Sequence, residues 1–122
     1  MYLKKNTNNI YVAELTSRSS LISPFYLFEM VSDDRSGYNK LFNVTDESTF
    51  KSRFNRFTIV ESGSTYENLS ASTVNLIPGS YTLNVYESNT PTLQISGTTG
   101  EIIYTNKAYV NGTNNDVDEV YR

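Results

Sequence analysis

The side chains of this chain that could do chemistry are almost all carboxylates. Its 122 residues include 13 Asp and Glu, and it contains no His and no Cys. A hydrolytic triad relies on a general base such as His, and zinc sites rely on imidazole or thiolate ligands. The missing Cys also excludes a disulfide framework. Chemistry based on carboxylates is therefore the one enzymatic route that the composition leaves open.

The acidic residues do not form a recognisable catalytic or metal-binding pattern. A glycosidase needs two carboxyl groups a few ångströms apart, and its candidates here would be Glu29, Glu61 and Glu87. The pairs Asp33-Asp34 and Asp46-Glu47 flank one predicted hairpin at its two ends, and neither belongs to an alternating Asp/Asn calcium loop. We interpret both pairs as solvated turn residues, and we predict no catalytic residue, no metal and no cofactor.

Charge and hydropathy also limit the partners. The net charge is −3, whereas nucleic-acid binding needs a concentrated positive stripe. Residues 50–57 mix three Phe with three basic residues, which could form a platform for single strands, but the acidic balance favours packing. No apolar run approaches the ~20 residues of a membrane span, and the N-terminus lacks the apolar core of a signal peptide. We expect a soluble chain that binds neither nucleic acid nor membranes.

The strongest structural signal lies at residues 76–86. Pro78 fixes its own φ and Gly79 permits a left-handed backbone, so the pair predicts a tight bend. From Tyr81 the chain alternates with period two, which indicates a strand with one buried face. This Leu-x-Pro-Gly-x-Tyr pattern resembles the tyrosine corner of immunoglobulin-like and fibronectin-like domains, in which the phenol bonds back to upstream backbone. Tyr81 is then a structural residue; an ordinary turn before a strand is the alternative.

The rest of the chain reads as short strands joined by turns. Ser and Asn suit turns, and Thr, Tyr and Phe suit a half-buried pleated surface. Residues 25–31 are apolar on both faces apart from Glu29 and are the candidate for the central strand. We predict an all-β, Ig-like or fibronectin-like Greek-key β-sandwich of about seven strands. The expected strands are residues 9–15, 25–31, 38–44, 54–61, 81–86 and 101–110, with minor strands ending at 74 and covering 93–95.

The two ends of the chain are expected to be arms on this domain. The predicted division is an N-terminal arm at 1–9, the sandwich at 10–111 and an acidic tail at 112–122. Such arms gain order by docking on a neighbour, often by adding a strand to an open sheet edge. Ordinary frayed termini are the alternative. The apolar anchors, and hence the candidate partner-binding residues, are Tyr2, Leu3, Val117, Val120 and Tyr121.

Three stretches carry a resemblance to a known group of proteins. Residues 24–29, 53–59 and 76–87 are similar to the small Ig-like structural proteins encoded among the capsid and neck genes of tailed bacteriophages, the crAss-like group in particular. The resemblance spans roughly residues 25–110 and rests on fold motifs. It implies a non-enzymatic virion component, an auxiliary protein bound outside the major capsid shell. Its partners would be the major capsid protein or neighbouring copies in a large symmetric assembly.

A second function from a different class stays open. Exposed tyrosine rings could stack on sugars, which would make the chain a carbohydrate-binding or adhesion module. The candidate stacking residues are Tyr66, Tyr86 and Tyr109.

Overall fold

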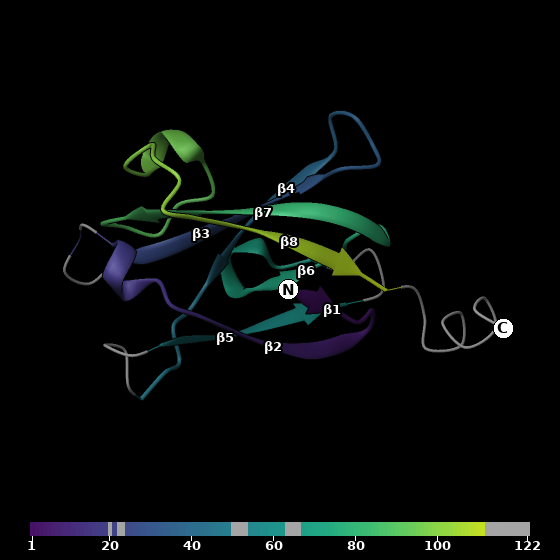
Figure 1. Cartoon of the computed structure of the whole chain (residues 1–122), viewed down its shortest axis with the longest axis horizontal. Coiled ribbons are helices and arrows are strands. Elements are labelled where there is room, and N and C mark those ends of the chain that lie inside the picture. The colour runs from purple at the N-terminus through teal and green to yellow at the C-terminus, as the bar shows by residue number, and fades with distance from the viewer. Residues whose placement is uncertain (20, 22–23, 50–53, 63–66, 112–122) are drawn as a thin grey trace, which may run out of the picture.

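Eight β-strands in two sheets and three single-turn 3₁₀ helices make up the described part of the computed structural model (Figure 1). That part covers residues 1–19, 21, 24–49, 54–62 and 67–111. It contains no α-helix, so the all-β prediction is confirmed. The elements are β1 (Tyr2–Leu3), β2 (Thr7–Ala13), η1 (Thr16–Arg18), β3 (Phe25–Ser32), β4 (Asn39–Val44), β5 (Asn55–Glu61), η2 (Leu69–Ala71), β6 (Thr73–Val74), β7 (Gly79–Ser88), η3 (Ile95–Gly97) and β8 (Tyr104–Val110).

The strands are divided between a five-stranded and a three-stranded sheet. The larger sheet has the order β1-β8-β7-β3-β4, and its pairs are antiparallel except for β1 and β8. The smaller sheet has the order β2-β5-β6, with β2 antiparallel and β6 parallel to β5. The strand β3 is paired along both of its edges, but β7 holds the middle position of the five-stranded sheet, so residues 25–31 are not its central strand.

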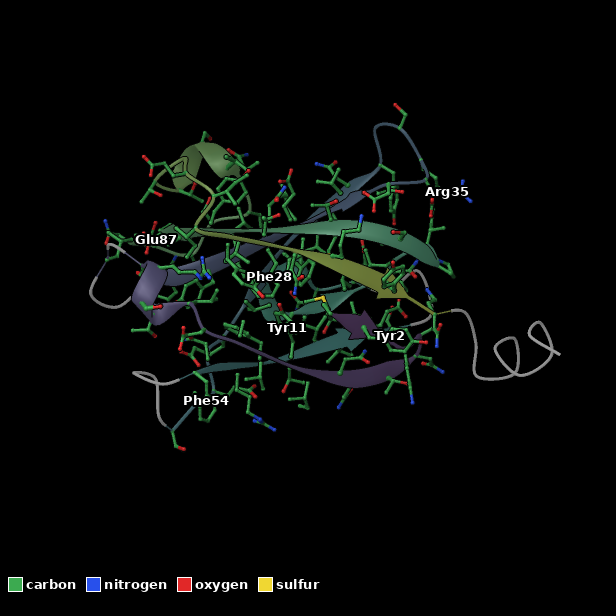
Figure 2. The ribbon with its side chains drawn as sticks, viewed as in Figure 1. Tyr2, Tyr11, Phe28, Arg35, Phe54 and Glu87 are labelled. Carbon is green, nitrogen blue, oxygen red and sulfur yellow. The ribbon has the colours of Figure 1, made fainter. Side chains whose placement is uncertain are left out.

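The core lies between the two sheets and is rich in aromatic rings. Period-two alternation turns Phe57 and Ile59 of β5 inward, and both are fully buried. Phe28 of β3 is also fully buried, and its ring meets Phe57 at 5.2 Å and Tyr11 at 6.3 Å between ring centroids, in edge-to-face geometry. Figure 2 shows Tyr11 and Phe28 near the middle of the molecule. These ring contacts connect the two layers directly.

The expectation of an N-terminal arm over residues 1–9 is wrong. Tyr2–Leu3 forms β1, which pairs in parallel with the end of β8, and Leu3 is only 1% exposed inside the core. The Met1 amino group donates to the Lys107 carbonyl at 3.0 Å, and the Met1 carbonyl accepts from the Tyr109 amide at 3.0 Å. The segment does add a strand to an open sheet edge, but the edge belongs to its own chain.

A buried ion pair fixes the same segment from the other side. The Lys5 Nζ atom lies 2.8 Å from Oε2 of Glu61, whose side chain is fully buried, and it also donates to the Leu76 carbonyl at 2.8 Å. Glu61 further accepts from the amides of Asn6 at 3.1 Å and Leu76 at 2.7 Å. The sequence pattern could not reveal this pair, because its two members are 56 residues apart along the chain.

The minor strand expected at residues 93–95 is not formed. Thr92 accepts a hydrogen bond from the Gln94 amide, and the Gly97 amide bonds the Gln94 carbonyl in the turn η3. These local bonds provide hydrogen-bond partners for the backbone groups, so the segment does not need to pair with another strand. Thr side chains compete with strand pairing in this way. The segment rejoins the sheet where the Ile103 amide donates to the Val85 carbonyl at 2.8 Å.

In the described ranges, no helix has the length and apolar character needed to cross a membrane.

Candidate functional site

The tyrosine of the predicted corner is buried and bonded back to the chain. Tyr81 is 1% exposed, and its hydroxyl donates to the carbonyl of Ile77, four residues upstream. Burial, and secondarily the neighbouring Tyr38, raises the pKa of the Tyr81 phenol. The hydroxyl therefore stays protonated and serves as a donor over the whole physiological pH range. This is the hydrogen bond that the sequence predicts for a corner tyrosine.

The backbone conformation at the corner favours Gly79, and the Asp34 side chain would have to shift to admit any larger residue. The φ of Gly79 is 149°, a conformation that side chains with a Cβ rarely adopt, and an added Cβ would lie 2.7 Å from Oδ2 of Asp34. That same oxygen accepts from the Ser80 amide at 2.9 Å. The turn between β3 and β4 is thus tied to the first residues of β7. The result is a platform held by hydrogen bonds at one end of the five-stranded sheet.

Replacing Tyr81 by phenylalanine tests the corner. The Tyr81→Phe substitution is expected to lower the free energy of unfolding by about 1–2 kcal/mol, because the Ile77 carbonyl loses its buried donor. Tyr109→Phe is the matched control, since the Tyr109 side chain is exposed and the change should stay within ~0.5 kcal/mol. Urea unfolding of both variants measures the difference. Equal stabilities would remove the structural role of the Tyr81 hydroxyl.

Two exposed tyrosines lie side by side on this platform. Tyr109 is opposite Ser80 in the β7–β8 ladder and opposite Tyr2 in the β1–β8 ladder, so the three side chains form one row on the outer face. Tyr2 is 55% exposed and Tyr109 is 51% exposed. We call this area the corner surface. A shallow hollow of about 510 Å³ is lined by Tyr2, Pro78, Gly79, Ser80, Tyr109, Val110 and Asn111.

An ion pair borders the corner surface. Lys107 Nζ lies 2.5 Å from Oδ2 of Asp33, and Asp33 also accepts from the hydroxyls of Ser80 and Thr82, each at 2.9 Å. The Lys107 hydrogen bond, helped by the two hydroxyls, lowers the pKa of the Asp33 carboxyl. A carboxylate with such a pKa and three donors is a poor general base. The arrangement suits recognition by packing and hydrogen bonding.

The buried carboxylates elsewhere each have a structural partner. Glu29 accepts from the side-chain amides of Asn84 at 3.1 Å and Asn39 at 3.3 Å, and from the Tyr86 hydroxyl at 3.3 Å. Glu61 holds Lys5, and Glu87 accepts from the Ser19 hydroxyl. Figure 2 shows Glu87 at the opposite end of the molecule from Tyr2. Among the residues that the structure describes, no three acidic side chains gather into a possible metal site.

The turn acids predicted to be solvated are also bonded. Asp46 accepts from the Asn55 side chain at 2.6 Å, and Glu47 accepts from the Thr58 hydroxyl at 2.8 Å and pairs with Arg56 at 3.2 Å. Asp33 and Asp34 hold the corner, as described above. These contacts hold the turns against neighbouring strands.

No family model, curated protein or solved structure matches this chain. The candidate site therefore rests on the geometry of the chain itself.

The structure separates the residues that the sequence groups as partner-binding. Tyr2 is exposed on the corner surface, whereas Leu3 belongs to the core and cannot contact a partner; that assignment of Leu3 is wrong. The physical reason is the strand alternation of β1, which sends neighbouring side chains to opposite faces. The three tail candidates, Val117, Val120 and Tyr121, lie outside the described residues.

The tyrosines considered for sugar stacking also separate. Tyr86 is only 7% exposed, because it packs on the outer sheet face and bonds Glu29, so it cannot stack on a ligand. Tyr109 is exposed, and Tyr66 lies outside the described residues. Of the aromatic group at 50–57, Phe57 is a core residue and offers no platform for bases.

Sequence reasoning missed a second exposed apolar pair. Ile10 and Val12 of β2 are 52% and 54% exposed on the outer face of the smaller sheet, while Tyr11 and Ala13 turn inward. The alternation was visible, but both faces of the strand are apolar, so hydrophobicity alone did not decide which face is buried. The single signal available was the greater size of the Tyr11 ring, which favours the core.

Proposed function

We propose that this chain is a non-catalytic structural protein of a bacteriophage particle, an auxiliary capsid protein that binds neighbouring virion subunits. Its partners are the major capsid protein or adjacent copies in a large symmetric assembly, where many modest contacts add together. The motif resemblance at residues 24–29, 53–59 and 76–87 supports the phage assignment. The engagement of the described buried carboxylates in structural bonds supports a role without catalysis.

The proposed fold is an Ig-like, fibronectin-like Greek-key β-sandwich. Two features support it. The strands β3 and β4 form a hairpin in one sheet, the chain crosses to the other sheet for β5 and β6, and it returns for β7 and β8. The bond from Tyr81 to the Ile77 carbonyl sits where a tyrosine corner would place it, at the start of the strand that follows the crossing.

The observation that carries the proposed function is the exposed pair Tyr2 and Tyr109 on the hydrogen-bonded corner. Tyrosine contributes a large contact area at low entropic loss and is enriched at protein interfaces. The backbone beneath the pair is held by the Asp34–Ser80 bond and by the docked β1 strand. A partner would therefore meet a surface already in its bound shape, which lowers the entropic cost of binding.

Alanine substitutions at this pair test the proposal. The double variant Tyr2→Ala/Tyr109→Ala is expected to bind purified particles at least tenfold more weakly, because interface tyrosines contribute roughly 2 kcal/mol or more when they act as anchors. Phe25→Ala is the matched control, since Phe25 is a 46% exposed aromatic residue of β3 outside the corner surface. Particle occupancy measured by co-sedimentation decides the outcome. Unchanged occupancy in the double variant would contradict the proposal.

The exposed Tyr109 ring also favours a second candidate, a carbohydrate-binding or adhesion module. A ring of this kind beside hydroxyl and charged side chains, here Ser80 and Lys107, could stack on a sugar and bond its hydroxyl groups. A glycan array separates the two functions. Saturable binding that disappears in Tyr109→Ala would favour sugar recognition over a virion role.

A further inference from the structure

Among the described residues, no strand pairs with the outer edge of β2. This strand forms the border of the smaller sheet, and its antiparallel register with β5 runs without interruption from the Thr7–Glu61 pair to the Ala13–Asn55 pair. Figure 1 shows β2 along the lower border of the molecule. The edge of β4 in the other sheet is partly occupied, because the Ser72 hydroxyl donates to the Asn43 carbonyl at 2.8 Å.

The hydrogen-bonding groups on the free edge can be assigned from the bonds of β5. The Arg56 carbonyl accepts from the Glu47 amide, and the Val60 amide donates to the Ser72 carbonyl, so both residues direct their backbone groups away from β2. In an antiparallel ladder, residues that bond the partner strand alternate with residues whose backbone groups point away from it. The β2 residues opposite Arg56 and Val60 are Val12 and Asn8. The outward groups of β2 are therefore those of Asn8, Ile10 and Val12, and none of them has a partner within the described part of the chain.

This edge lacks the features that protect ordinary edges from pairing. Natural edge strands carry charges, proline, bulges or very short lengths. β2 is seven residues long, TNNIYVA, with no charge, no Pro, no Gly and no break in its register. The β4 edge, by contrast, carries Lys40, which pairs with Glu67. An unprotected edge with exposed Ile10 and Val12 beside it is suited to pairing with another strand.

We propose that the β2 edge pairs antiparallel with the β2 edge of a second copy, about a twofold axis at Tyr11. In this register Ile10 of each copy lies opposite Val12 of the other, and Asn8 lies opposite Glu14. The facing residues on both strands are those with outward backbone groups, so the ladder can form with good geometry. The arrangement joins two three-stranded sheets into one six-stranded sheet. It is isologous, because both copies use the same surface, related by the twofold axis.

Side chains favour this register. The four residues Ile10 and Val12 from both copies form one apolar cluster on the outer face, and β-branched pairs of this kind stabilise strand pairing. Each Glu14 faces a neutral Asn8, and the two Glu14 side chains lie about 20 Å apart, six residues along the strands, so like charges do not meet. The alternative register with Ile10 opposite Ile10 leaves Val12 opposite Asn8 and gains less apolar contact.

The pairing of two β2 edges goes beyond the proposed function, because it requires only copies of this chain and no other particle protein. A single strand pairing buries less than the roughly 1,200–2,000 Å² of a standard interface, so the free dimer is expected to be weak. In an assembly the same contact would be reinforced by others. Failure of the β2 pairing would leave the particle-binding role of Tyr2 and Tyr109 untouched, since the two are measured separately.

Disulfide trapping in the full chain tests the pairing and its register. The chain has no Cys, so introduced thiols are unique. In the proposed register, Ile10 and Val12 of the two copies have Cα atoms about 5.5 Å apart, within disulfide range, whereas like residues are about 9 Å apart and beyond it. Mixing an Ile10→Cys chain with a Val12→Cys chain should give at least tenfold more disulfide dimer than either chain alone. Val60→Cys, on the same face one strand inward, is the control and should give none above background.

Sedimentation equilibrium gives a second, independent measurement. Val12→Lys is expected to weaken self-association at least tenfold, because it places a charge in the apolar cluster, while Val60→Lys should leave association unchanged. Mixed Ile10→Cys and Val12→Cys chains that trap no more dimer than Val60→Cys would overturn the proposal. So would Ile10→Cys alone trapping as much dimer as the mixture, because that result requires a different register.

Discussion

Deleting residues 1–5 is expected to lower the free energy of unfolding by at least about 5 kcal/mol. The deletion removes Leu3 from the core, and loss of a buried leucine side chain costs about 2–5 kcal/mol. It also removes Lys5, which leaves the buried carboxylate of Glu61 without its cation, and breaking a buried pair costs about 3–5 kcal/mol. The total is comparable with the whole stability of a small domain, so much of the protein should be unfolded at 25 °C.

Urea unfolding followed by circular dichroism measures this effect, and two variants separate its causes. Combining the deletion with Glu61→Gln should recover part of the stability, because a neutral amide is easier to bury than a carboxylate that has lost its lysine. Arg56→Ala is the control for a surface ion pair: Arg56 and Glu47 are about 40% exposed, and its loss should cost at most about 1 kcal/mol. A deletion variant as stable as the full chain would show that β1 is dispensable.

Phe28→Ala is expected to destabilise the protein by about 3–5 kcal/mol. Phe28 is fully buried, and its ring contacts Tyr11 and Phe57 of the smaller sheet and Phe42 of its own sheet. Its removal would leave a cavity between the two layers, where the surrounding strands are held in register and cannot collapse to fill it.

A residue on the same strand provides the control for Phe28. Phe25 is 46% exposed, so Phe25→Ala should change the free energy of unfolding by less than about 1 kcal/mol. Both variants replace Phe by Ala, so the difference between their free energies of unfolding reports the effect of burial. If both variants unfold at the same urea concentration, Phe28 does not join the two sheets in the way described.

The corner and the β2 edge would give the chain two separate contact surfaces. The corner surface lies on the five-stranded sheet, and the β2 edge belongs to the three-stranded sheet. If both are used, one copy could pair with another through β2 while Tyr2 and Tyr109 contact a different subunit. This division suits a protein that reinforces an assembly, because each contact can be weak on its own.

The sequence alone determined the strand pattern and the corner. Period-two alternation depends on local backbone geometry, so the positions of β2, β3, β4, β5 and β7 could be read within a few residues. The bend at Pro78 and Gly79 and the upstream bond of Tyr81 are also local, since that bond spans four residues. The lack of His and Cys showed, without any knowledge of the fold, that this chain supplies no imidazole or thiolate ligand.

Only the tertiary structure decided what the ends and edges of those strands do. Whether residues 1–5 form an arm or a strand depends on Glu61 and Val110, which are far away along the chain. Which face of β2 is exposed depends on the ring of Phe28 on the opposing sheet, because both faces of that strand are apolar. The local sequence pattern determines the face of the strand to which each side chain points. The contribution of that side chain to the free energy of folding depends on the distant residues that it contacts.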